Sequence, residues 1–263
     1  MYKMLEIEYD GAVATLWMNR PEVHNAFNAE LIAELTAACR QLSDNDAVRV
    51  VILGGRGKSF SAGADLNWMK AAGAATEAEN FTDAKKLATM LRTLAELPKP
   101  TIARVHGAAF AGGMGLAAAC DICVASDNAS FATTEVRVGI IPSTIGPYVM
   151  RAIGARQAYR YFLTAERMSS QRALELGLVH ERIESTQLDV TIKRICDALL
   201  LGGPKALSAS KDLIRFLQSQ PLDDGMIDAT AQRIAAVRAT PEAKEGLDAF
   251  LAKRKPDWLP NNP

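Results

Sequence analysis

The sequence has little that would suit it to nucleic acid or to a membrane. Its 263 residues carry 30 Lys and Arg against 30 Asp and Glu, so a formal net charge of +0 gives no electrostatic reason to expect DNA, RNA or an anionic membrane as a partner. The longest nearly uncharged stretch, residues 105–120, is rich in Gly and Ala and too short to span a bilayer. The first residues lack the apolar core of a signal peptide. We therefore expect a soluble, cytoplasmic protein with no nucleic-acid or membrane partner.

Cysteine and histidine are also scarce, with four and three residues. Cys120 and Cys123 form a Cys-x-x-Cys, but no second pair and no nearby His completes a metal or redox motif. We expect small buried thiols in a reducing compartment and no metal site.

The order of apolar patterns along the chain predicts an α/β core followed by a helical region. Strand-like runs alternate with helix-like segments in the first half, which favours α/β architecture. From about Ser143 onward strand signals almost vanish, and Thr240-Pro241-Glu242 is a typical helix start. We predict a core domain over residues 1–200 and a helical region over 201–263, whose apolar faces need the core or another subunit to pack on. The expected strands are 5–9, 13–18, 48–53, 101–105 and 122–125, and the expected helices begin near residues 29, 66, 77 and 113.

Two glycine-rich segments, Ser59–Asp65 and His106–Gly115, each follow a predicted strand. A backbone without bulky side chains lets a ligand approach its N–H groups closely. Two such segments in one domain can give two N–H donors to one developing negative charge, which is how an oxyanion hole is built. The alternative is that both are only tight turns at strand ends.

Two other glycine patterns point to different enzyme classes. Gly57-Lys58-Ser59 is similar to a phosphate-binding P-loop, but Ile52 stands where that motif needs its first glycine. Gly113-x-Gly115-x-x-Ala118 fits a dinucleotide fingerprint, with Glu135 twenty residues beyond Gly115. In that fold the acid ends the second strand, whereas Glu135 lies beyond the predicted strand 122–125. A nucleotide hydrolase and a nicotinamide-dependent oxidoreductase are both disfavoured.

Several segments in fixed order resemble the enoyl-CoA hydratase/isomerase, or crotonase, family. The resemblance covers essentially the whole chain, and it is the set in this order that makes it specific. The segments are Asn19-Arg20-Pro21, Asn25-Ala26, Ser61–Leu66, Gly107–Gly113 with Cys120-Asp121, Phe131–Pro142 and Phe250–Trp258.

The family resemblance implies a fold and an assembly. It implies a crotonase-like spiral of ββα units with a C-terminal helical trimerisation region, so that the protein is expected as a homotrimer or homohexamer. The segments 64–69, 136–140 and 145–149, with Gly115, most resemble bacterial methylglutaconyl-CoA hydratase-type members. Such relatives act on branched or isoprenoid glutaconyl thioesters.

The resemblance also implies roles for single residues. The amides of Ala64 and Gly112 match the oxyanion donors, and Glu135 matches a catalytic glutamate in apolar sequence, where burial can raise its pKa. Coenzyme A is expected only as part of the substrate, with no other cofactor. Lys253 is equally explained as a favourable charge at a helix C-terminus. The residues expected to contact coenzyme A are Val23, His24, Ala62, Asp65, Leu66 and Lys253.

One position departs from the hydratase pattern. Many hydratases of the family carry a second glutamate at the position of Gly115, which has no side chain. Either Glu135 makes both proton transfers through one water, or a hydroxyl such as Ser143 or Thr144 substitutes, or the reaction is not hydration. We expect hydration of an α,β-unsaturated acyl-CoA; an enoyl-CoA isomerase using the single Glu135 and a weakly catalytic acyl-CoA-binding subunit remain open.

Overall fold

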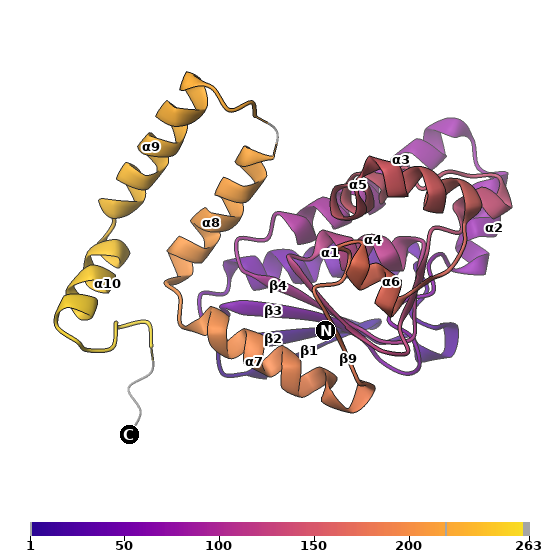
Figure 1. The fold of residues 1–263 in the computed structure, drawn as a ribbon. Coiled ribbons are helices and arrows are strands. Elements are labelled where there is room, and N and C mark those ends of the chain that lie inside the picture. The colour runs from indigo at the N-terminus through magenta and orange to yellow at the C-terminus, as the bar shows by residue number, and fades with distance from the viewer. Residues whose placement is uncertain (1, 219, 260–263) are drawn as a thin grey trace.

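The computed structural model describes residues 2–218 and 220–259 and is built around a six-stranded sheet (Figure 1). The strand order is β1-β2-β3-β4-β6-β9, with β1 and β2 an antiparallel hairpin and all later pairs parallel. A second sheet has the order β5-β7-β8. The strands are β1 Leu5–Asp10, β2 Val13–Met18, β3 Val50–Gly55, β4 Thr101–Val105, β5 Ala108–Phe110, β6 Ile122–Ser126, β7 Ser130–Ala132, β8 Met168–Ser169 and β9 Glu181–Ile183.

Helices cover both faces of the large sheet, which is why β3 is buried along its whole length. Val51 and Leu53 face the main core, which α1, α3, α4 and α5 complete, whereas Val50 and Ile52 face a smaller cluster under α7. This two-sided burial explains the continuous apolar run of a parallel central strand. The core helices are α1 Ala29–Asp44, α2 Leu66–Ala74, α3 Glu77–Ala95, α4 Gly112–Ala119, α5 Gly146–Thr164, α6 Ser170–Glu175 and α7 Leu188–Leu200, with short 3-10 helices η1 Pro21–Val23, η2 Glu135–Val138 and η3 Ser185–Gln187.

The predicted helix starts are confirmed by their caps. The Asn28 side chain accepts a hydrogen bond from the Leu31 N–H at 2.8 Å, and the Asp65 side chain accepts one from the Asn67 N–H at 2.9 Å. Thr76 and Glu79 form a capping box at the start of α3. These side chains satisfy amides that have no partner within the first turn of a helix.

Two short strands lie where the sequence pattern indicates almost none. β8 has two residues and β9 has three, and β9 is the polar Glu-Arg-Ile at the edge of the large sheet. Strands this short show no apolar alternation, so their pairing depends on neighbours distant in the chain. β5 and β7, of three residues each, were also not predicted, so the second sheet is a correction to the expected strands. The α/β class is as predicted, and all four cysteines are buried, as expected.

The C-terminal helices α8 Pro204–Leu217, α9 Asp224–Arg238 and α10 Pro241–Leu251 form an arm beside the core, drawn in orange to yellow in Figure 1. The domain boundary predicted after residue 200 falls at the end of α7, and the division into two domains stays a prediction. No helix in the part of the chain that the structure describes is both long and apolar enough to cross a membrane. The arm exposes the apolar side chains of Ile214, Leu217, Leu222, Ile227, Ile234, Leu247, Phe250 and Leu251.

A buried ion pair fastens the arm to the core. The Lys211 ammonium on α8 lies 2.6 Å from Asp121 Oδ2 and donates to the carbonyls of Leu97 and Lys99 at 2.7 and 2.8 Å. The same Asp121 oxygen accepts hydrogen bonds from the Thr101 N–H and hydroxyl. Asp121 of the Cys-x-x-Cys segment is therefore a structural anchor.

Lys211→Ala should lower the free energy of unfolding by about 3 kcal/mol, because it leaves Asp121 and two carbonyls without their cation. Urea denaturation measures the effect. Lys205→Ala, at an exposed position of the same helix, is the control and should change stability by less than about 0.5 kcal/mol. Equal, small effects at both positions would show that the anchor contributes nothing.

Candidate active site

The two glycine-rich segments lie against each other. The Ser61 N–H donates to the Ala108 carbonyl at 3.0 Å, and the Phe110 N–H donates to the Ser61 carbonyl at 2.9 Å. A Cβ on Gly113 would lie only 2.3 Å from the Ser61 carbonyl oxygen, so this approach requires glycine there. Segments about fifty residues apart in sequence are thus joined by backbone hydrogen bonds.

Ala64 keeps its amide free because of how its neighbours pair. The Phe27 N–H donates to the Gly63 carbonyl at 2.6 Å, and the Asp65 N–H donates to the Phe27 carbonyl at 2.8 Å. In such a parallel bridge the residue between the two bonded groups turns its own N–H to the other side. Within residues 2–218 and 220–259, the Ala64 N–H donates no hydrogen bond.

Gly112 offers the second free amide. It is the first residue of α4, where an N–H has no carbonyl in a preceding turn and the helix dipole favours negative charge. No acceptor for this amide is found among the described residues. Ala111, just before it, has φ 46° and ψ −118°, a conformation that favours glycine. Such strain persists only where surrounding structure enforces it, and it is common at functional sites.

Glu135 begins η2, directly after β7 and close to the second glycine-rich segment. β5 and β7 are paired, and the Ala111 N–H donates to the Ala132 carbonyl at 2.7 Å. Burial raises the pKa of the Glu135 carboxyl above its usual value. Its Oε2 is buried and has no hydrogen-bond partner in the described chain. A carboxyl in this state is suited to proton transfer.

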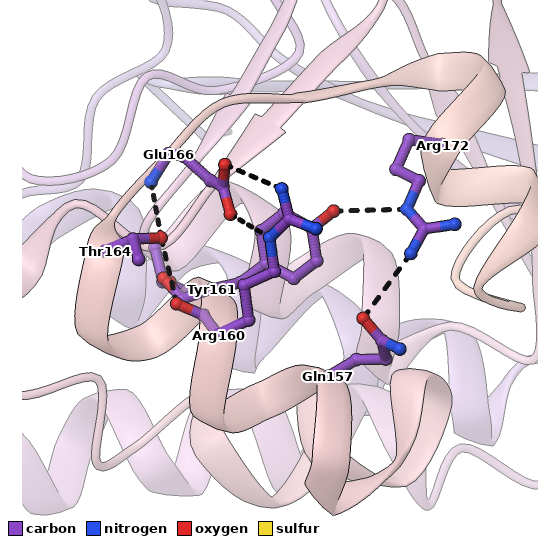
Figure 2. A network of polar contacts seen from close by, with 7 residues as sticks. Gln157, Arg160, Tyr161, Thr164, Glu166 and Arg172 are labelled. Carbon is purple, nitrogen blue, oxygen red and sulfur yellow. Dashed lines mark hydrogen bonds and ion pairs between the residues drawn. The ribbon is translucent and has the colours of Figure 1, made fainter.

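The segment that carries Glu135 is tied to the end of α5. The Thr133 hydroxyl donates to the Tyr161 carbonyl at 2.9 Å. Figure 2 shows the polar network at this end of the helix: Arg160 pairs with Glu166, and Arg172 donates to the Tyr161 hydroxyl at 3.2 Å. The Thr133 hydrogen bond thus attaches the chain just before Glu135 to the C-terminal end of α5.

Asp65 has a partner that the sequence analysis did not assign. Arg20 Nη2 donates to Asp65 Oδ2 at 2.8 Å, with both side chains largely buried, and its hydrogen bond lowers the pKa of Asp65. Arg20 also donates through Nη1 to the Ala26 carbonyl. The sequence pattern alone does not reveal this pair, because Arg20 and Asp65 lie 45 residues apart.

The residues predicted to contact coenzyme A are brought together only in part. The Ala62 N–H donates to the His24 carbonyl at 2.9 Å, and Val23 ends η1 just before His24. Leu66 is 81% exposed at the start of α2, beside Asp65. Lys253 follows α10 in the arm, which Figure 1 places away from α2, so this chain does not bring it to the other residues.

The place of the missing second carboxylate is filled by Ile145. A Cβ on Gly115 would lie 2.3 Å from Ile145 Cγ2 and 2.7 Å from its Cβ. Ile145 is 1% exposed, so it has little room to move away. Ser143, considered as a substitute, is exposed.

The other glycine patterns have structural explanations. Gly57, at φ +80°, forms a turn whose carbonyl accepts a hydrogen bond from His106 Nε2 at 2.8 Å. Glu135 lies in η2 after β7, and β6 is the strand that follows α4, so the dinucleotide arrangement is not reproduced. A cavity of about 820 Å³, lined by Trp17, Arg104 and α7, includes none of the predicted site residues.

Comparisons with known proteins all match this chain to enoyl thioester hydratases and isomerases. The family model described as Enoyl-CoA hydratase/isomerase matches residues 8–261. Crotonyl-CoA hydratase of Syntrophomonas wolfei is 33% identical over 260 residues, 98% of each chain. Trans-2-decenoyl-[acyl-carrier-protein] isomerase of Streptococcus mutans is 31% identical over 262 residues, again 98% of each chain. The crystal structure of an enoyl-CoA hydratase from Shewanella pealeana has a TM-score of 0.95 at 41% identity, covering 98% of this chain and 96% of that one. The fold implied by the resemblance is therefore confirmed.

The buried state of Glu135 should be visible in the pH dependence of stability. With its pKa raised on folding, the folded protein binds more protons than the unfolded chain between the two pKa values, so stability falls as pH rises through that window. Glu135→Gln cannot ionise, so it should gain stability relative to the wild type between about pH 4 and about pH 8. Urea denaturation at the two pH values tests this.

Glu184→Gln, at an exposed position, is the control for the charge change itself. A constant difference in stability between Glu135→Gln and the wild type at both pH values would contradict the burial of the charge.

Proposed function

The chain belongs to the enoyl-CoA hydratase/isomerase family of enzymes, and we propose that it adds water across the α,β double bond of an acyl-CoA thioester. The observation that carries the proposal is the set of two unpaired amides, Ala64 and Gly112, held on paired backbone segments in the domain that buries the Glu135 carboxyl. A relative of this chain is named as a crotonyl-CoA hydratase.

The amides would act on the thioester oxygen. When the β-carbon is attacked, the carbonyl gains enolate character and negative charge collects on its oxygen. The N–H groups of Ala64 and Gly112 donate to that oxygen and stabilise the enolate. Loss of one such donor typically costs about 3 kcal/mol of transition-state stabilisation.

Glu135 would make both proton transfers. Its carboxylate accepts a proton from water as the water oxygen bonds to the β-carbon, and then gives that proton to the α-carbon. The net change is addition of H and OH across the double bond, and the carboxylate is regenerated. One carboxylate is enough for this order of proton transfers. The scheme is therefore compatible with an apolar side chain, Ile145, beside Gly115.

The presence of Glu135 as a single carboxylate, with Ile145 beside Gly115, favours isomerisation as the second candidate. A single carboxylate can move one proton between carbons without any water. Ile145 removes the place for a second acid, and one relative is named as an isomerase of an acyl-carrier-protein thioester. A binding subunit with weak catalysis is the third candidate.

The substrate class we propose is a branched or isoprenoid glutaconyl thioester. The support is the likeness of residues 64–69, 136–140 and 145–149 to methylglutaconyl-CoA hydratase-type proteins. The carboxylate of such a substrate would reduce the need for a second acid from the enzyme. No further cofactor enters this scheme.

We further propose that Val23, His24, Ala62, Asp65 and Leu66 contact coenzyme A, and that Lys253 reaches its phosphates from a neighbouring subunit. The exposed apolar side chains of α8 to α10 support a homotrimer or homohexamer as the active assembly. A cytoplasmic location remains a prediction.

Product mass on a panel of enoyl-CoA thioesters tests the reaction. We expect a gain of one water with the wild type, and a loss of turnover of about 10²- to 10⁴-fold in Glu135→Gln with acyl-CoA binding retained by calorimetry. Unchanged mass with a moved double bond would establish an isomerase, and binding without turnover the third candidate. Unchanged turnover in Glu135→Gln would remove this residue from the mechanism.

The substrate carboxylate has its own test. We expect kcat/KM for crotonyl-CoA, which lacks the distal carboxylate, to be about 100-fold or more below that for 3-methylglutaconyl-CoA, since general acid–base assistance contributes about 10²- to 10⁴-fold. Steady-state kinetics with both thioesters gives the ratio. Comparable values would overturn the proposed substrate class.

A further inference from the structure

Phe27 touches both segments that carry the unpaired amides. Its backbone brackets Ala64, because its N–H donates to the Gly63 carbonyl and its carbonyl accepts from the Asp65 N–H. Its side chain, 1% exposed, lies against Gly112. A Cβ on Gly112 would lie 2.5 Å from Phe27 Cε2 and 2.8 Å from Cδ2, so the ring packs directly on the glycine backbone.

Phe27 is itself held firmly. Asn25 Nδ2 donates to the carbonyls of Ser59 and Arg56 at 2.8 and 2.9 Å, and the Ser61 hydroxyl donates to the Asn25 carbonyl at 2.9 Å. Arg20 binds the Ala26 carbonyl on one side and Asp65 on the other. These bonds fix residues 25–27 relative to the first glycine-rich segment.

Gly112 itself meets Phe27 through its backbone, while its neighbours Ala111 and Gly113 contact Ala132 and Ser61. It starts α4, its backbone is not in the left-handed region, and the ring of Phe27 provides the three nearest atoms that a Cβ there would meet. Beside the hydrogen bonds of Ser61 to residues 108 and 110, the Phe27 ring is therefore a direct spacer between Ala64 and Gly112, with a backbone bridge at one end and a van der Waals contact at the other.

We propose that Phe27 is a positioning residue that sets the separation of the two oxyanion donors. The inference rests on the proposed function, because it assumes that the Ala64 and Gly112 amides act on one thioester oxygen. Phe27 contacts no reacting atom. Misplacement of a donor by about 1 Å reduces the rate about 100-fold. Substituting a side chain that sets this distance should therefore lower kcat, whereas substituting one that only fills volume should lower stability alone.

The test is a set of single and double variants assayed on whichever thioester the wild type converts. Phe27→Leu removes the Cε and Cζ atoms under Gly112 and should lower kcat about 10-fold or more with KM changed less than about 2-fold. Phe27→Met, an unbranched chain of similar reach, should restore most of that loss. Leu42→Ala, a fully buried position at the far end of α1, should reduce stability with kcat unchanged.

The decisive comparison uses Gly112→Ala. Its new methyl meets the Phe27 ring, so kcat should fall about 100-fold. In Phe27→Leu/Gly112→Ala the ring atom nearest the new methyl, Cε2, is gone, and kcat should exceed that of Gly112→Ala alone. A double variant whose loss is the product of the two single losses, or an unchanged kcat in Phe27→Leu, would overturn the inference.

The outcomes distinguish failure of the proposed function from failure of the positioning role of Phe27. Absence of turnover by the wild type on every thioester, or full activity in Glu135→Gln, would reject the proposed function. With an active wild type that depends on Glu135, independent effects at residues 27 and 112 would reject only the role of Phe27.

Discussion

The whole site depends on the hydrogen bonds that Ser61 makes across to residues 108 and 110. They join a loop that follows β3 to a loop that leads into α4, and they need the bare backbone of Gly113 opposite the Ser61 carbonyl. Once this contact is made, other pairings extend it on both sides. Phe27 pairs with Ala64 of the first loop, and β7 pairs with β5. Glu135 follows β7 in the chain and so lies next to this pair of strands. Two amides and a carboxyl from three distant segments thus belong to one continuous backbone framework.

Local chemistry made part of this arrangement predictable. Asn28, Asp65 and Thr240 are capping residues beside helical periodicity, and each caps a helix in the structure. The glycine-rich segments indicated only where backbone amides could lie open to a ligand, and the family resemblance assigned Ala64, Gly112 and Glu135. For the helix caps, the deciding hydrogen bond lies within three residues of the side chain that reveals it.

The interactions that escaped prediction are those between distant segments. Arg20 binds Asp65, Lys211 binds Asp121, and Ile145 fills the space beside Gly115, all across at least 30 residues of sequence. The absence of a carboxylate at Gly115 was evident from the sequence, but only the fold shows that a buried aliphatic chain occupies its place. β5, β7, β8 and β9 were missed for the same reason, because strands of two or three residues owe their pairing to neighbours.

Helix α4 begins at Gly112 and ends immediately before Cys120 and Asp121. One end therefore carries a candidate oxyanion donor, and the other leads into the aspartate that holds the Lys211 side chain of the C-terminal arm. The helix has 8 residues, which makes it about 12 Å long. A single short, buried helix thus connects the attachment point of the C-terminal arm to the candidate oxyanion donor.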